Sequence, residues 1–119
     1  MKLEKIREYC LAKKGVTESF PFDDVTLVLK VGSKMFGLFN VNSDKATINL
    51  KCDPTIAEFL RTKYEDDIRP GYHMNKKHWN TVNVDSSIIP ESEIIDMINN
   101  SYDLVFKGLK KAEKEDVLR

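Results

Sequence analysis

The sequence predicts an α+β domain, an antiparallel sheet with helices packed mainly on one face, in the order α-β(3)-α-β(1-2)-α. Three observations support this class. A charged segment of helical periodicity opens the chain, three strand patterns separated by turn residues fill residues 25–51, and two further amphipathic helices follow. At 119 residues, with 41% hydrophobic and 32% charged side chains, the chain has the size and composition of one globular domain, expected over residues 1–119.

The first helix is expected over residues 2–14. Leu3, Ile6, Cys10 and Leu11 fall on one face of it, and Gly15 provides a stop. We therefore expect Cys10 to be a core residue, because a free cysteine behaves as a small buried hydrophobe.

Residues 25–51 are typical of a three-stranded meander. The strands are expected at residues 25–31, 35–41 and 46–51. Gly32-Ser33 is a two-residue hairpin signal that pairs Val31 with Lys34. The core face would then carry Val25, Leu27, Leu29, Phe36 and Leu38. The second face would carry Thr26, Val28, Lys30, Met35, Gly37 and Phe39, covered either by the last helix or by residues 70–82.

The second helix begins at Asp53-Pro54, with the aspartate as N-cap and the proline at the first helical position. It is expected to end near Tyr64. Residues 78–84 alternate and are rich in strand-forming types, so they predict a strand. A last helix is expected from near Pro90, with a stripe of Ile94, Ile98, Tyr102, Val105 and Leu109.

Charge and targeting patterns narrow the function classes. Nineteen basic residues balance nineteen acidic ones, so the whole molecule has no general attraction for nucleic acid or anionic membranes. No apolar run is long enough to span a bilayer, and the charged first residues do not resemble a secretory signal. Cys10 and Cys52 have no nearby partner cysteine. We expect reduced thiols, a cytoplasmic location and no membrane partner.

Catalytic signatures are missing. The chain has no GxSxG motif, no P-loop and no GxGxxG, so we expect a non-enzymatic protein without catalytic residues or a cofactor. Cys52 precedes a helix N-terminus, which can activate a thiol, but the position also suits an inert buried one. His73 and His78 are five residues apart, a spacing that suits neither a helix face nor a strand face, so no metal site is expected.

The most informative stretch is residues 70–82, which lies within a longer segment, residues 69–84, that contains no acidic side chain. Cations interleaved with aromatic rings suit a phosphate backbone and unstacked bases, and amides can read base edges. Gly71 is expected to take a positive φ in a Pro-Gly turn. With the meander lysines, the candidate nucleic-acid-binding residues are Lys30, Lys34, Lys51, Arg69, Tyr72, His73, Asn75, Lys76, Lys77, His78, Trp79 and Asn80. The alternative is that Trp79 and Val82 are core and the histidines hold the loop.

Five blocks of the chain resemble the MmcQ/YjbR family of small bacterial proteins. They are Phe20 to Asp23, Lys30 to Phe36, Ile48 to Pro54, Pro70 to Val82 (PGYHMNKKHWNTV) and Ser101 to Val105. The resemblance implies a CyaY-like or secretion-chaperone-like fold of the order α-β(3)-α-β(2)-α. It also implies DNA binding through a double-wing arrangement, an expectation based on fold analogy.

Three hypotheses follow for function. The first is DNA binding through residues 69–80 and the hairpin lysines. The second is a protein-interaction or chaperone-like module that uses the sheet face around Val28, Met35 and Phe39. The third is a small-molecule pocket formed by His73, His78, Trp79 and Asn80.

Overall fold

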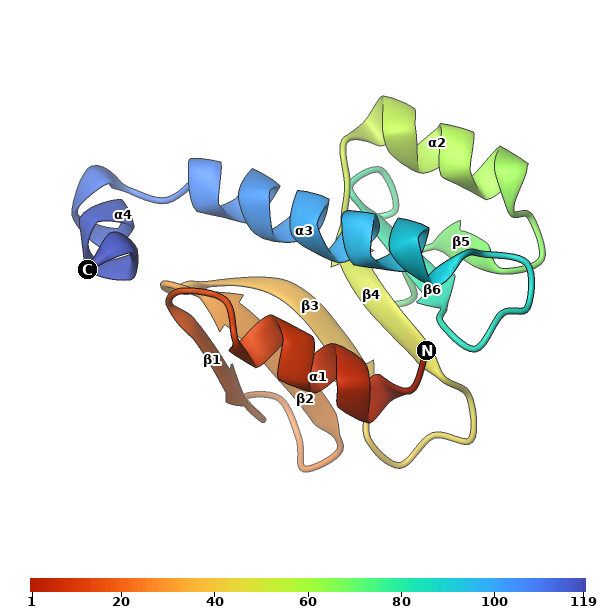
Figure 1. Ribbon diagram of the computed structural model, residues 1–119, viewed down its shortest axis with the longest axis horizontal. Coiled ribbons are helices and arrows are strands. Elements are labelled where there is room, and N and C mark those ends of the chain that lie inside the picture. Colours follow the sequence, from red (N-terminus) through yellow and green to blue (C-terminus); the bar gives the residue numbers. More distant parts are fainter.

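The computed structural model describes residues 1–119 as four helices and six strands (Figure 1). In chain order the elements are α1 (Leu3–Leu11), β1 (Val16–Ser19), β2 (Thr26–Val31), β3 (Lys34–Asn40), β4 (Thr47–Lys51), α2 (Pro54–Lys63), β5 (Ile68–Pro70), β6 (Trp79–Asn83), α3 (Glu91–Lys107) and α4 (Lys111–Leu118). The strands form one antiparallel sheet in the order β1-β2-β3-β4-β6-β5. The predicted α+β class is confirmed.

The helices lie on one face of the sheet. In Figure 1, α1 and α3 cross this face, α2 lies above the β4, β5 and β6 side, and α4 stands at the far end of α3. The main core between the sheet and these helices has twenty buried residues, among them Ile6, Leu29, Phe36 and Ile98. Cys10 belongs to this core, as its helical position predicts.

The second helix begins as its sequence predicts. Asp53 is the N-cap, and its carboxylate accepts a hydrogen bond from the Thr55 amide at 3.0 Å. Pro54 occupies the first helical position, where a missing N–H costs nothing. The hairpin after Val31 also has the expected start, since Val31 pairs with Lys34 and Gly32 has φ +58°.

A β-bulge changes the faces predicted for the second half of β3. Lys30 pairs with Met35, but Leu29 pairs with Gly37, so Phe36 is the extra residue. The one-residue shift reverses every later side chain. The predictions for Leu38, Gly37 and Phe39 are therefore wrong: Leu38 lies on the second face, Gly37 faces the core side chains of β2 and β4, and Phe39 is buried in the main core.

Two elements were not predicted. Residues Val16–Ser19 form an edge strand against β2, although they carry only one hydrophobic residue. The last helix ends at Lys107, and a short break through Gly108 separates it from α4. Leu109, which was predicted to extend the helical stripe, is buried in that break instead.

The sheet face without helices, called here the open face, has its own small apolar cluster. Val28, Leu38 and Trp79 are buried there, with Met35 and Met74 packed against them. Met74 comes from residues 71–78, the loop between β5 and β6, which is called here the cover loop. Of the two expected covers, it is residues 70–82 and not the last helix that pack on this face, and they cover the part around Val28 and Met35.

Candidate functional site

Strand register places several polar side chains on the open face. Residues paired directly across neighbouring strands point to the same side of a sheet. Lys51 pairs with Trp79 and Asn49 with Thr81, while Arg69 of β5 also pairs with Thr81. The Thr81 hydroxyl and the Asn49 amide oxygen lie 2.5 Å apart, which confirms their common side.

The start of the cover loop is fixed to strand β6. The Gly71 amide donates to the Trp79 carbonyl at 2.8 Å, and the Tyr72 amide donates to the Thr81 hydroxyl at 3.1 Å. A Cβ at residue 71 would lie 2.7 Å from the Cβ of Trp79, so only glycine fits. The predicted positive φ at Gly71 is wrong. It is His73 that has one, at 59°, while Gly71 is required by close approach.

Arg61 of α2 fastens the other side of the cover loop. Its Nε donates to the Asn80 side-chain oxygen at 2.7 Å, and one terminal nitrogen donates to the carbonyls of Lys76 and, at 3.2 Å, Trp79. The Asn80 side-chain nitrogen donates in turn to the Ala57 carbonyl at 3.4 Å. The sequence does not predict this role, because nothing near Arg61 in the chain indicates that it faces a segment fifteen residues later.

Two hollows lie side by side on the open face. One, of about 730 Å³, is bounded by the cover loop and the cluster that contains Leu38 and Trp79. The other, of about 560 Å³, lies toward β5 and is lined by Lys45, Arg69 and several hydroxyl groups. Phe39, Asn40, Asn49 and Tyr72 line both, so the two hollows form one continuous concave surface.

The structure separates the predicted site residues into three groups. Those on the open face or its cover loop with accessible side chains are Lys30, Lys51, Arg69, Tyr72, His73, Asn75, Lys76, Lys77 and His78. Trp79 and Asn80 are only 7% and 2% exposed. Trp79 packs in the sheet cluster and Asn80 holds Arg61, so neither presents its side chain for stacking or base reading.

Lys34 belongs to a different part of the surface. Its ammonium group donates to the Gly108 carbonyl at 3.2 Å, at the junction of α3 and α4. The helical side there also holds α4 through the Glu113 carboxylate, which accepts from the Ser33 amide at 3.0 Å. Lys34 is therefore not grouped with the cover loop.

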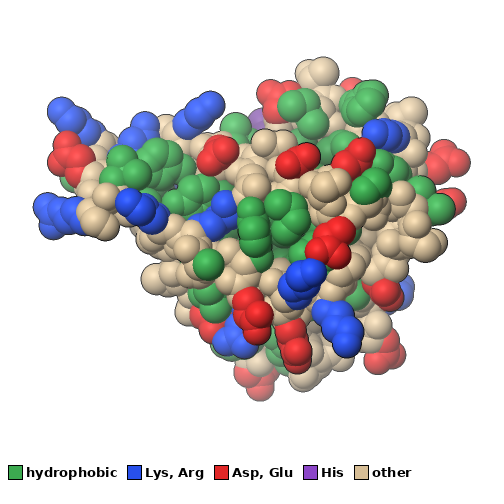
Figure 2. Space-filling model, in the orientation of Figure 1, with side chains coloured by type: hydrophobic (Ala, Val, Ile, Leu, Met, Phe, Trp, Pro, Cys, Tyr) green, Lys and Arg blue, Asp and Glu red, His purple; other side chains and the backbone are tan.

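The helical face offers no comparable concentration of one charge. Figure 2 shows acidic and basic side chains interspersed over it, with basic side chains gathered mainly at the protruding α4 end. Several are neutralised in surface ion pairs, such as Lys5 with Glu91 at 2.7 Å and Lys63 with Glu93 at 3.2 Å. This face therefore gives less support to an anionic ligand than the open face does.

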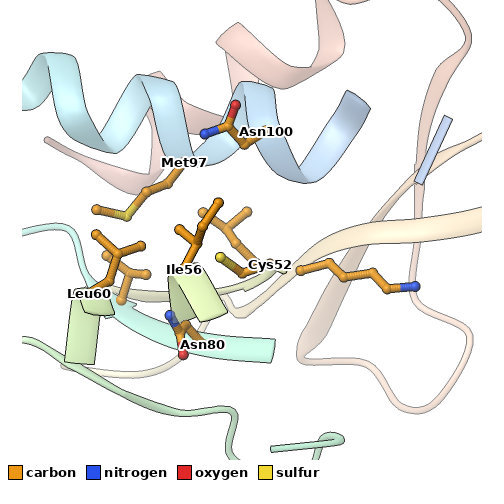
Figure 3. Close-up of a pocket in the computed structure, with 9 residues that line it drawn as sticks. Cys52, Ile56, Leu60, Asn80, Met97 and Asn100 are labelled. Carbon is orange, nitrogen blue, oxygen red and sulfur yellow. The ribbon is translucent and has the colours of Figure 1, made fainter. Parts of the chain in front are cut away.

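Cys52 lines a narrow crevice between α2 and α3. Figure 3 shows Met97 from α3 and Ile56 and Leu60 from α2 converging beside its sulfur. The space is only about 20 Å³, close to the volume that one water requires. Burial, reinforced by the neighbouring Asp53 carboxylate, raises the pKa of the Cys52 thiol. The position before a helix therefore does not activate this cysteine.

No three potential metal-ligating side chains of the His, Cys, Asp or Glu types lie together. His73 instead stands against Tyr72, with ring centroids 4.0 Å apart and planes inclined at 52°. No helix of the chain is long and apolar enough to cross a membrane.

Comparison with known proteins identifies the family. The YjbR family profile matches residues 11–104, which include the cover loop and both hollows. The chain belongs to the YjbR family. It is 34% identical to YjbR of Escherichia coli (strain K12) over 102 residues, covering 86% of this chain and 85% of that protein. It is 40% identical to YbdF of Escherichia coli O157:H7 over 114 residues, covering 96% and 92%.

Solved structures of similar proteins agree with the fold. The crystal structure of Deinococcus radiodurans protein DR2400, a protein with a DUF419 domain, superposes with a TM-score of 0.89 at 39% sequence identity. The match covers 98% of this YjbR-family chain and 87% of DR2400. A Pseudomonas syringae protein at 24% identity has a TM-score of 0.70, covers 87% of this chain and 98% of its own, and shares the fold alone.

Proposed function

We propose that this YjbR-family chain binds nucleic acid on the open face of its sheet. The observation that carries the proposal is the juxtaposition of cations with an accessible aromatic ring. Arg69 and Lys45 line the hollow next to Tyr72, whose side chain is 70% exposed. Lysines 76 and 77 in the cover loop and lysines 30 and 51 on the sheet add positive charge around the same surface.

Few acidic side chains line this surface, so there is little negative charge to repel a phosphate. Asp23 is the one acidic residue among those that line the two hollows. Its carboxylate already accepts hydrogen bonds from the amides of Val25 and Thr26, at 3.0 and 2.6 Å. These bonds hold the pKa of Asp23 below its ordinary value and fix the carboxylate toward its own turn. The local field can therefore favour a phosphate although the net charge is zero.

The alternative, a protein-interaction or chaperone-like module, depended on apolar side chains of the second sheet face. Val28 is fully buried beneath the cover loop cluster, and Phe39 is 6% exposed in the main core. Met35 is half-buried against the same cluster. Since only Met35 of these three side chains stays partly accessible, the face offers a partner protein little apolar surface, and the geometry favours nucleic acid.

Fluorescence anisotropy of a short labelled oligonucleotide tests the proposal. Between about 50 and 200 mM salt we expect affinity to fall steeply, because bound cations displace counterions from the phosphates. Lys76→Ala combined with Lys77→Ala should weaken binding and make the logarithmic salt slope shallower by about one unit per lost phosphate contact.

The matched control is Lys2→Ala combined with Lys107→Ala, which removes the same two charges from exposed residues at the start of α1 and the end of α3, on the helical side. It should leave both affinity and slope unchanged. Equal effects of the control and the cover-loop variants would mean that only the total charge matters. Binding without salt dependence, or no binding at low salt, would contradict the proposal.

A further inference from the structure

We infer that the larger hollow, beside Tyr72, is a seat for one unpaired nucleotide, with its base over the apolar cluster and its phosphate toward Arg69. The inference rests on the proposed function and names its ligand: single strands, rather than paired duplex. The group that this hollow would bind is a nucleoside phosphate, either as part of a strand or as a free nucleotide.

The base half of the seat combines an apolar floor with an amide rim. Met35, Leu38 and Met74 contribute the floor, and Asn40, Asn49 and Asn75 contribute amide groups around it. A nucleobase requires both parts, because its faces need flat apolar contact while its edge needs hydrogen-bond donors and acceptors in the plane of the ring. The hollow, about 730 Å³, is within the range of small-ligand sites.

The rim also carries two adjacent rings in an unusual local conformation. His73 is the one residue other than glycine with a positive φ, at 59°. This backbone conformation places the His73 ring against the Tyr72 ring, with the two ring centroids 4.0 Å apart. Non-glycine residues adopt this region uncommonly, although histidine does so more often than most, and such conformations recur at ligand sites. A base can stack on the accessible Tyr72 ring, since every base has a π face.

The phosphate half adjoins the base half and contains no acidic residue. Lys45 and Arg69 supply charge, and the hydroxyls of Ser43 and Thr47 supply neutral donors. Because Tyr72, Asn40 and Asn49 line both halves, a base in one hollow places its phosphate in the other. A paired base cannot enter, because its edge is occupied and its faces are stacked, so the geometry selects unpaired nucleotides.

The test compares three ligands on the full chain: a labelled single-stranded DNA, the duplex of the same sequence, and a free nucleoside monophosphate as competitor. We expect the single strand to bind at least about tenfold more tightly than the duplex. Tyr72→Ala should remove about tenfold of single-strand affinity and leave duplex affinity unchanged, whereas Tyr72→Phe should keep the preference because it keeps the ring. An unchanged unfolding midpoint for Tyr72→Ala, as expected for an exposed side chain, confirms that the fold is intact.

Other outcomes separate the two proposals. Salt-dependent binding with equal single-strand and duplex affinities, or an equal loss of both on Tyr72→Ala, overturns the seat and keeps nucleic-acid binding. Binding of the free nucleotide alone, lost on Tyr72→Ala, supports the seat and overturns nucleic-acid binding as the function. Absence of binding by all three ligands overturns both.

Discussion

Replacing Arg61 with alanine should loosen the cover loop from the rest of the fold. Three acceptors lose a guanidinium donor: the Asn80 side-chain oxygen and the carbonyls of Lys76 and Trp79. The Trp79 carbonyl keeps its bond from the Gly71 amide, and the Lys76 carbonyl belongs to an exposed residue that water can reach. The Asn80 oxygen has no such replacement, because that residue is only 2% exposed.

The loss in free energy of unfolding comes mainly from the Asn80 side-chain oxygen, which is left buried without a hydrogen-bond donor. Leaving a buried acceptor without its partner costs about 1–3 kcal/mol, and because charge-assisted bonds to the carbonyls are lost as well, we expect the upper part of this range, about 2–3 kcal/mol. For a domain of this size the thermal midpoint should fall by roughly 6–12 °C. Arg61→Lys, which keeps the charge but has no planar fork, should restore only part of the loss.

Urea denaturation followed by circular dichroism measures this change directly. The double variant Arg61→Ala with Asn80→Ala should be less destabilised than the sum of the two single variants, because their side chains share one hydrogen bond. Lys63→Ala is a suitable control on the same helix, since its exposed ion pair with Glu93 should contribute little. A stability of Arg61→Ala within about 0.5 kcal/mol of the parent would refute the assigned role.

Three further predictions concern other parts of the structure. Gly71→Ala should destabilise the fold by about 1–3 kcal/mol and weaken oligonucleotide binding, because the new Cβ meets Trp79 at 2.7 Å; unchanged urea and anisotropy curves would contradict this. Neither cysteine should react with iodoacetamide in the native protein at neutral pH, since burial raises the pKa of Cys10 to about 12 and also raises that of Cys52. Mass spectrometry should find both thiols alkylated only after denaturation, and rapid native labelling of Cys52 would contradict the inert assignment. The hydrogen bond from Tyr64, with a smaller effect of Lys63, lowers the pKa of Glu93, so its contribution to stability is complete above the unfolded value near 4.3 and is lost as pH falls through the lower folded value. Glu93→Gln should therefore flatten the acid limb of the stability profile, and an unchanged limb would exclude this contribution.

Local patterns predicted much of the fold. Asp53 and Pro54 start α2 as expected, because capping depends on groups within a few residues of each other. The hairpin at Gly32 was predicted for the same reason, because its turn depends on neighbouring residues. The bulge at Phe36 was not predictable in this way, since Phe36 looks like any other strand residue and only pairing with β2 leaves it unopposed. The edge strand β1 was missed for a similar reason, because contact with β2 rather than its own pattern makes it a strand.

At the candidate site, too, local patterns predicted some features, while others depend on contacts between distant segments. The acid-free stretch drew attention to the segment that borders both hollows, but residue type alone did not distinguish accessible from buried side chains. Trp79 carries the ring that sequence chemistry favours for stacking, yet it is packed against Val28 and Leu38. Within this segment Tyr72 has the exposed ring instead, and Arg61 is the support that holds its loop. Both assignments depend on contacts across the fold.

The salt dependence of oligonucleotide binding by the parent chain and by Arg69→Ala tests the central claim most directly. Arg69 belongs to β5, contributes no side-chain hydrogen bond within the fold and lines the hollow assigned to phosphate. Anisotropy titrations over a range of salt should show a steep slope for the parent and a slope shallower by about one unit for the variant, with lower affinity. Identical slopes and affinities for the two proteins would contradict nucleic-acid binding on the open face.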